Sequence, residues 1–197
     1  MWDVRWRRRA PPSMFRYTRK DVTKVSRIQL TLKRSTVRPW RPDDAESLVR
    51  HANNRKVWLA LRDGFPHPYM IEDARKFLQA TIKSEPITLF CVEVNGAAAG
   101  GIGIHLGIDV HRHTAELGYW LGEEFWGRSI MTEAVMAFAD FCFKTFSLRR
   151  IYAEPFANNP ASGRVLEKAG FTLEGRLKNN VIKDGELLDS LLYARTT

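Results

Sequence analysis

Apolar and polar residues alternate along several short stretches of the chain, and this period of two residues is typical of β-strands. Two neighbouring pairs of these stretches are joined by Asn95-Gly96 and by Asp184-Gly185, dipeptides that strongly indicate hairpin turns. The predicted strands cover residues 30–40, 87–94, 98–108, 113–121, 150–155, 171–182 and 186–194.

Other stretches repeat apolar residues every three or four positions, which predicts helices with one buried face. Pro42-Asp43-Asp44 is a helix start signal, and Gly170 is a helix stop signal. The predicted helices cover residues 42–53, 57–61, 72–83, 131–146 and 160–169. Apart from the short piece at 57–61, the elements read β-α-α-β-β-β-α-β-α-β-β in chain order. This order predicts an α/β domain with a mixed, twisted sheet flanked by helices.

The positive charge of the chain is concentrated at its N-terminal end. The net charge is +9 over 197 residues; residues 1–34 contain eleven Lys or Arg and two Asp, whereas residues 35–197 contain twenty residues of each sign. We interpret residues 1–26 as a basic leader: a disordered tail, the product of an early start codon, or alternatively a transit peptide. Residues 27–197 are expected to form one domain of balanced charge, with no nucleic-acid partner.

Composition narrows the class of protein further. A hydrophobic content of 44% and a charged content of 27% are typical of soluble globular proteins, and no apolar run is long enough to span a membrane. Cys91 and Cys142 lie in separate apolar stretches, which indicates buried thiols in a reducing compartment, so we expect a cytoplasmic protein. His111 and His113 lack a third ligand, and we expect no metal. A monomer and a homodimer both stay open.

One strand leads through a short turn into a helix, an arrangement that can hold an anion. The strand ends near Leu121, Gly127 lies in the turn, and the helix begins near Met131. The first turn of a helix leaves backbone N–H groups unpaired and favours negative charge, so it can bind a pyrophosphate. Gly127 would let a phosphate approach the backbone, and Arg128 adds positive charge. Many such turns bind nothing, so this unit alone is a weak signal.

A second unit follows one strand later, where Asn159 and Pro160 begin a helix that Gly170 ends. Together the two units resemble the GNAT family of N-acetyltransferases, and in particular its RimJ/RimL-like branch of ribosomal-protein N-terminal acetyltransferases. The resemblance covers about residues 30–194. Its motifs are Arg38-Pro39-Trp40-Arg41 with Asp44-Ala45, Phe65-Pro66-His67-Pro68-Tyr69, Glu116 with Gly118-Tyr119-Trp120-Leu121, Trp126-Gly127-Arg128, Asn159 with Ser162, and Glu167-Lys168-Ala169-Gly170-Phe171.

The resemblance implies a single GNAT domain that uses acetyl-CoA as its cosubstrate. The family's pyrophosphate loop corresponds to Trp126, Gly127, Arg128, Ser129, Ile130 and Met131, followed by Thr132. Ser129 replaces the usual Gly and Met131 the usual small residue, so we expect weaker coenzyme binding than is normal in the family. The family's binding of the pantetheine arm corresponds to the backbone of Tyr119, Trp120 and Leu121 and to Asn159. One backbone N–H there would polarise the thioester carbonyl.

The resemblance also implies candidate catalytic residues. Glu116 occupies a strand position where the family often has a carboxylate that faces the acceptor, so it is a candidate base or amine anchor. The alternative is a carboxylate that orders the loop above it. Many members use a Tyr as the acid for the departing thiolate, but Leu166 stands at that position here. Ser162 is the remaining candidate, and the alternative is a helix-turn hydroxyl.

The family covers its acceptor with the helix-loop-helix region between the first strand and the first hairpin. The candidate substrate-binding residues there are Trp58, Arg62, Phe65, His67 and Tyr69, together with Glu116. We expect acetylation of a primary amine, first of all a protein or peptide N-terminal α-amine. A small-molecule amine (a polyamine, an amino sugar or an amino acid) and a non-catalytic acetyl-CoA-binding module are the alternatives.

Overall fold

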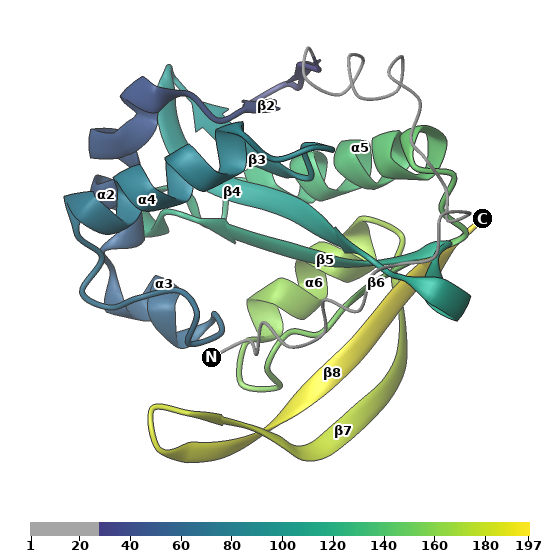
Figure 1. Ribbon diagram of the computed structural model, residues 1–197. Coiled ribbons are helices and arrows are strands. Elements are labelled where there is room, and N and C mark those ends of the chain that lie inside the picture. The colour runs from purple at the N-terminus through teal and green to yellow at the C-terminus, as the bar shows by residue number, and fades with distance from the viewer. Residues whose placement is uncertain (1–27) are drawn as a thin grey trace.

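Eight strands form one mixed sheet in the computed structural model, which describes residues 28–197 (Figure 1). The strands are β1 (Leu30–Thr31), β2 (Thr36–Pro39), β3 (Leu89–Val94), β4 (Ala97–Leu106), β5 (Thr114–Leu121), β6 (Arg150–Ala153), β7 (Thr172–Lys183) and β8 (Glu186–Thr196). Their order is β1-β2-β3-β4-β5-β6-β8-β7. Only the β5–β6 pairing is parallel among them. The predicted fold class is confirmed. The predicted leader, residues 1–26, lies outside the described residues.

Helices cover both faces of this sheet (Figure 1). They are α2 (Ala45–Ala52), α3 (Arg55–Leu59), α4 (Ile71–Ile82), α5 (Ile130–Thr145) and α6 (Pro160–Lys168), with short 3₁₀ helices η2 (Pro42–Asp44), η3 (Asp109–His111) and η4 (Glu123–Phe125). One core cluster joins the sheet to α5 and α6 through Phe138 and Leu166. A second joins it to α2 and α4 through Leu48 and Leu78. The sheet is therefore the middle of three layers.

Strand β5 contributes to both core clusters because its side chains alternate between the two faces. Ala115, Leu117 and Leu121 are buried against the α5 side, whereas Trp120 packs with the cluster on the α2 and α4 side. Glu116 shares the face of Trp120, so the candidate base lies on the α2 and α4 side of the sheet.

The predicted first strand, residues 30–40, is two strands. The Leu32 N–H donates to the Ser35 carbonyl at 2.9 Å, which closes a turn between β1 and β2. Lys33 and Arg34 lie in this turn, and a run of polar residues does not favour the centre of a strand. The turn matters for function because it places Arg34 near the N-terminus of α5.

Helix α3 begins two residues earlier than predicted because Asn54 caps it. The Asn54 side-chain oxygen accepts hydrogen bonds from the backbone N–H groups of Lys56 (2.8 Å) and Val57 (3.3 Å). The helix ends at Leu59, and the following loop carries Arg62 toward β5.

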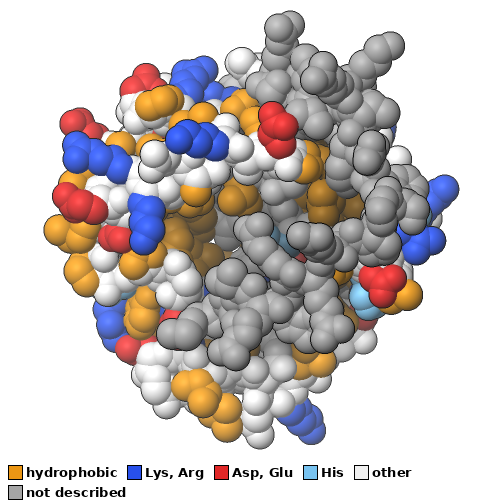
Figure 2. Space-filling model, viewed as in Figure 1, with side chains coloured by type: hydrophobic (Ala, Val, Ile, Leu, Met, Phe, Trp, Pro, Cys, Tyr) orange, Lys and Arg blue, Asp and Glu red, His pale blue; other side chains and the backbone are white. Residues whose placement is uncertain are grey.

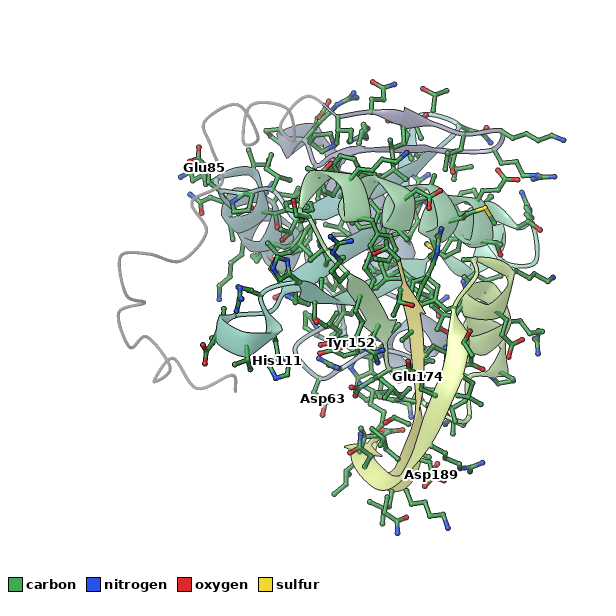
Figure 3. All side chains as sticks on the ribbon, turned by 90° about the vertical axis from the view of Figure 1, so that its right-hand side faces the viewer. Asp63, Glu85, His111, Tyr152, Glu174 and Asp189 are labelled. Atoms are coloured by element: carbon green, nitrogen blue, oxygen red, sulfur yellow. The ribbon has the colours of Figure 1, made fainter. Side chains whose placement is uncertain are left out.

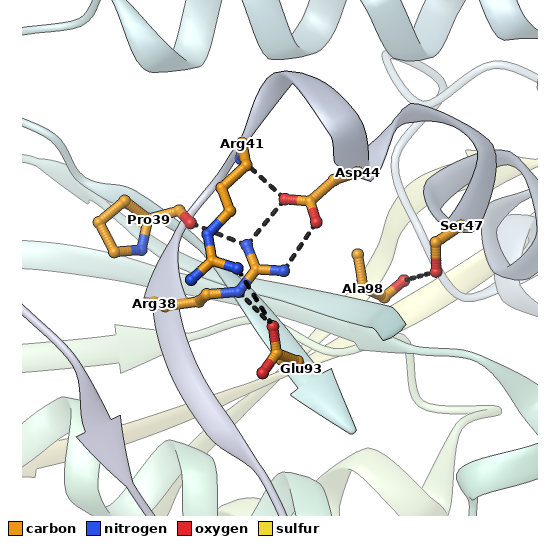
Figure 4. A network of polar contacts seen from close by, with 7 residues as sticks. All are labelled: Arg38, Pro39, Arg41, Asp44, Ser47, Glu93 and Ala98. Atoms are coloured by element: carbon orange, nitrogen blue, oxygen red, sulfur yellow. Dashed lines mark hydrogen bonds and ion pairs between the residues drawn. The ribbon is translucent and has the colours of Figure 1, made fainter. Parts of the chain in front are cut away.

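The Arg38-Pro39-Trp40-Arg41 motif with Asp44 is structural (Figure 4). Arg38 is 3% exposed and donates two hydrogen bonds to Asp44, at 2.7 and 2.8 Å, and one to Glu93 at 2.5 Å. Asp44 also accepts the backbone N–H of Arg41 at 2.7 Å. Burial opposes the charge of Arg38, but these partners raise its pKa above the ordinary value. Breaking such a buried pair typically costs about 3–5 kcal/mol. The network ties β2, β3 and η2 together.

Charges on the surface of the described residues are mixed in sign. On the face drawn in Figure 2, Lys and Arg side chains are interspersed with Asp and Glu. This distribution agrees with the balanced composition of residues 35–197.

Candidate active site

The two parallel strands at the centre of the sheet separate partway along their length. The β5–β6 register ends at the pair Glu116–Tyr152, whereas β5 stays paired with β4 as far as Gly100–Leu121. Beyond Glu116, no strand within residues 28–197 pairs with this edge of β5. An extended chain could pair with this edge as an additional strand would.

Hydrogen bonds at both ends of the β4–β5 ladder determine which backbone groups face the opening. The Gly107 N–H donates to the Thr114 carbonyl at 2.8 Å, and the Gly122 N–H donates to the Ala99 carbonyl at 2.8 Å. Bonded pairs alternate along an antiparallel ladder, so the N–H and C=O of Tyr119 point away from β4. They face the opening, where a pantetheine amide could bind them.

Trp126 fastens the turn after β5 to the end of that strand. Its indole N–H donates to the Leu121 carbonyl at 2.7 Å. The Leu121 carbonyl would otherwise face the opening, but this hydrogen bond occupies it. The N–H and C=O of Tyr119 are therefore the more accessible backbone groups. The side chain of Trp120 points to the other face, where its ring meets Phe65 edge to face at 5.6 Å.

The turn before α5 contains two residues with a positive φ. Gly127 has φ 73°, and Ser129, which immediately precedes the helix, has φ 60° and ψ 8°. A non-glycine residue in this left-handed region typically costs about 1–3 kcal/mol. Ser129 thus stands where glycine fits better, as its replacement of the family's glycine suggested. Ile130 and Met131 point into the core, so Met131 does not obstruct the approach of a phosphate.

A pocket of about 540 Å³ opens at this turn, and it is basic. It is lined by Arg34, Val94, Asn95, Gly127, Arg128, Ser129 and Ile130. Two guanidinium groups and the unpaired N–H groups of the first turn of α5 together suit a pyrophosphate. Arg34 also forms an ion pair with Glu133, in the first turn of α5. The apolar pattern predicts one uninterrupted strand over residues 30–40, and for that reason it does not reveal Arg34 as a pocket residue.

Tyr119 and Ser162 meet between β5 and α6. The Tyr119 hydroxyl lies 2.7 Å from the Ser162 hydroxyl and 3.2 Å from the Ser162 carbonyl. Asn159 caps α6 by accepting the backbone N–H of Ser162 at 3.2 Å. Burial raises the pKa of the Tyr119 phenol well above its usual value, so the phenol stays neutral and can donate a hydrogen bond. The sequence indicated Ser162 and the backbone of Tyr119, but not this side-chain pair.

Leu166, which occupies the position of the family's tyrosine, is fully buried in the core between α6 and the sheet. A tyrosine there would have to place a larger side chain in a packed interior, which generally destabilises a protein. Leu166 is therefore a packing residue, and the predicted candidate Ser162 contacts the Tyr119 side chain of β5.

Glu116 is already paired, and its partner is another predicted site residue. The Arg62 guanidinium contacts both carboxylate oxygens of Glu116, one of them at 3.4 Å. The neighbours of Glu116 across the sheet are His105 on β4 and Tyr152 on β6, on the same face. Two residues further along β5, a Cβ placed on Gly118 would meet no atom within 4 Å. The strand thus has a bare surface beside the carboxylate.

The predicted substrate-binding residues between β2 and β3 form what we call the acceptor wall. Their aromatic side chains fall into two groups. Phe65 packs on Tyr69 at 4.9 Å and on Trp120, within the second core cluster. Tyr69 is buried, and burial raises its pKa to about 12, so its role is packing. Trp58 and His67 stack on each other at 5.5 Å, apart from that cluster.

The β7–β8 hairpin reaches back to this wall. Lys183 is 2% exposed, lies 3.6 Å from the centre of the Trp58 ring and donates to Asp63 at 2.7 Å. Arg55 pairs with Asp184 at the tip of the same hairpin. The hairpin therefore braces α3 and the loop after it, a contact between distant segments that the sequence did not reveal.

No group of three or more His, Cys, Asp or Glu side chains within residues 28–197 is arranged to hold a metal ion. No helix within the same range is long and apolar enough to cross a bilayer.

The opening beside β5 and the basic pocket at the N-terminus of α5 together suit a coenzyme with an extended arm and a pyrophosphate. The family model described as an acetyltransferase (GNAT) domain matches residues 34–172, and this chain belongs to that family. It is an acetyl-CoA-dependent N-acetyltransferase, as the motifs predicted.

Three relatives illustrate the match. The ribosomal-protein-serine acetyltransferase of Escherichia coli is 31% identical over 144 residues, which are 71% of this chain and 80% of that protein. A GNAT-family acetyltransferase structure from Bacillus anthracis has a TM-score of 0.74 and 25% identity, and covers 86% of this chain and 98% of its own. The structure of Mycobacterium smegmatis RimJ in complex with CoA-disulfide has a TM-score of 0.73 and 27% identity, with 83% and 82% covered.

Proposed function

We propose that this enzyme acetylates the α-amino group of a protein or peptide N-terminus. The observation that carries the proposal is the bare surface of β5 at Gly118, between the Glu116 carboxylate and the backbone groups of Tyr119 that face the opening. A chain terminus can lie along such a surface with its amine at the carboxylate. The E. coli relative is named as an enzyme that acts on a ribosomal protein, which supports an acceptor of this class.

The residues of the site suit direct transfer. Acetyl-CoA supplies an activated acyl group; the amine forms the new C–N bond as the C–S bond breaks. Glu116 accepts the proton of the attacking amine, directly or through water. A backbone N–H of the segment 119–121 donates to the carbonyl oxygen, on which negative charge develops. An α-amine has a pKa near 7.7–8.0, so roughly a tenth is neutral at pH 7 and a modest base suffices.

In this scheme Ser162 stabilises the departing thiolate. The Tyr119 and Ser162 hydroxyls lie 2.7 Å apart, and either can be the donor. In the proposed arrangement, the Tyr119 phenol donates to the Ser162 oxygen, and the Ser162 hydroxyl donates to the thiolate. Neither group needs to lose its proton, because the thiolate can take a proton from solvent after it leaves. The pair replaces, by hydrogen bonding alone, the tyrosine that is absent at Leu166.

The charges around the site argue against a polyamine acceptor. Such a substrate would need several unpaired carboxylates, whereas Glu116, Glu123 and Asp63 are already paired. Arg62 pairs with Glu116, Lys56 and Asn54 with Glu123, and Lys183 with Asp63. A single ammonium group can exchange with Arg62, but a chain of ammonium groups would have to break several ion pairs.

The proposal is tested by measuring thiol release from acetyl-CoA with three acceptors at equal concentration. These are a short peptide with a free N-terminus, the same peptide with its N-terminus blocked and a lysine added, and spermidine. We expect release only with the free N-terminus, and mass spectrometry should locate the acetyl group on the α-nitrogen. Turnover of spermidine or of the lysine peptide alone would refute the proposal. No turnover with any amine would favour the non-catalytic binding module.

A further inference from the structure

Arg62 is paired with Glu116, the carboxylate that the acceptor amine must reach in the proposed function. It comes from the loop after α3, and 48% of its side chain is exposed, against 19% for Glu116. The two groups contact each other beside the bare surface at Gly118. An amine that binds Glu116 therefore has to displace the guanidinium of Arg62.

The other cations on this wall have partners that the amine does not disturb. Their ion pairs are Arg55–Asp184, Lys183–Asp63 and Arg150–Glu174. Each of these carboxylates lies outside β5, on the hairpin, on the loop after α3 or on β7. Among these cations, Arg62 is thus the one that loses its carboxylate when the acceptor enters.

Different charged groups lie on the two sides of Glu116. Tyr152 lies beside Glu116 in the β5–β6 register, and Figure 3 labels it. Burial first, and then the nearby carboxylates Glu116 and Glu154, raise the pKa of the Tyr152 phenol, against the opposing influence of Arg62 and Arg150. An ammonium group is favoured beside these carboxylates, whereas an anion is favoured on the α3 side, at Arg62.

We propose that Arg62 is a specificity-determining residue that selects acceptors with a carboxylate on the side chain of their first or second residue. The proposal rests on the proposed function. With such an acceptor, the amine pairs with Glu116 and the acceptor carboxylate pairs with the released Arg62, so that one ion pair is exchanged for two. With a neutral acceptor, the released guanidinium of Arg62 is solvated by water and gains no carboxylate partner.

The expected preference is modest because Arg62 is about half exposed. Exposed ion pairs change an equilibrium by up to about fivefold, and the effect is screened by salt. We therefore expect an acidic acceptor to have a kcat/KM about two- to fivefold higher than its amide counterpart at low salt, with the difference shrinking as salt is added.

The test compares C-terminally amidated peptides that differ by one group: Asp-Ala against Asn-Ala, and Ala-Asp against Ala-Asn, at their first two positions. Each pair is measured with the wild type, Arg62→Gln, Arg62→Lys and Arg55→Gln. Arg55→Gln is the matched control, because it removes the same charge from the same wall at a pair that lies away from Glu116. Thermal melts check that each variant is folded.

We expect at least one acidic peptide to be preferred by the wild type, the preference to vanish in Arg62→Gln, and part of it to return in Arg62→Lys. Arg55→Gln should keep the wild-type ratio. Equal kcat/KM for both members of both pairs would overturn the inference and leave the proposed function intact. An equal loss of preference in Arg55→Gln would overturn the inference, because it would show that the overall positive charge of this wall, and not Arg62 itself, attracts the acidic acceptor. Failure to acetylate any of the peptides would contradict the proposed function itself.

Discussion

In the proposed function, the coenzyme side and the acceptor side of β5 use different parts of the chain. At residues 126–132, the groups proposed to bind the coenzyme are mainly backbone N–H groups, supported by Arg34 and Arg128. On the acceptor side, the groups are side chains that already pair with one another, such as Arg62 with Glu116. Backbone recognition tolerates a change of side chain, whereas paired side chains depend on both members. We therefore expect substitutions to have larger and more selective effects on the acceptor side.

The largest expected effect is that of Glu116→Gln. A positioned base typically contributes about 10²–10⁴-fold, and an α-amine that is partly neutral needs less help, so we expect turnover to fall by about one to three orders of magnitude. Coenzyme affinity, measured by calorimetry, should stay the same because Glu116 lies away from the turn before α5. Glu123→Gln is the control; it removes a carboxylate that pairs with Lys56 and should leave turnover within about twofold. Equal losses in both variants would show that the acceptor side responds to charge alone.

Tyr119→Phe and Ser162→Ala test the hydroxyl pair where the two sides meet. A hydrogen bond of this kind is worth about 1 kcal/mol, so each change should lower turnover by roughly tenfold or less. Because the phenol acts through the serine, the double variant should be no slower than Ser162→Ala alone. Coenzyme affinity should be unchanged, since the backbone of Tyr119 is kept. Independent, multiplying losses would mean that the two hydroxyls act separately.

A smaller effect, and of the opposite sign, is expected for Ser129→Gly in the coenzyme turn. Relief of the positive φ should raise the free energy of unfolding by about 1 kcal/mol, partly offset by the greater freedom of glycine in the unfolded chain. Ser129 already has the left-handed conformation that glycine would keep, so coenzyme affinity should improve by no more than about threefold. Ser129→Ala is the control, because it removes the hydroxyl and keeps the strain. A stabilisation by Ser129→Ala equal to that of Ser129→Gly would contradict the strain argument.

The smallest effect is expected from His51, which packs behind the coenzyme turn against Phe125. Burial lowers the pKa of His51, against the opposing influence of Glu124, so the folded protein favours the neutral imidazole. This contribution to stability is complete above the unfolded pKa of about 6.5 and is lost as the pH falls toward the folded value. His51→Leu should therefore flatten the decline in melting temperature below about pH 6.5. An unchanged decline would exclude His51 as its source.

The same contrast between the two sides explains how much of the site the sequence could predict. The turn at Gly127 and the cap at Asn159 are local, because their backbone chemistry is encoded by neighbouring residues. The β-α order of the fold was predictable for the same reason. The pairs Arg62–Glu116 and Lys183–Asp63 join residues 54 and 120 positions apart, and no local pattern encodes them. Arg34 was missed because a two-residue strand and a tight turn look like one strand in the pattern of apolar positions.

The central claim is that Glu116 accepts a proton from an α-amine, and the most direct measurement is turnover against pH for the wild type and Glu116→Gln with one peptide. We expect the ratio of the two rates to be largest below about pH 7.7, where most of the amine is protonated, and to shrink as the pH rises past the pKa of the amine. A ratio near one at every pH would contradict the claim and would make Glu116 a structural partner of Arg62.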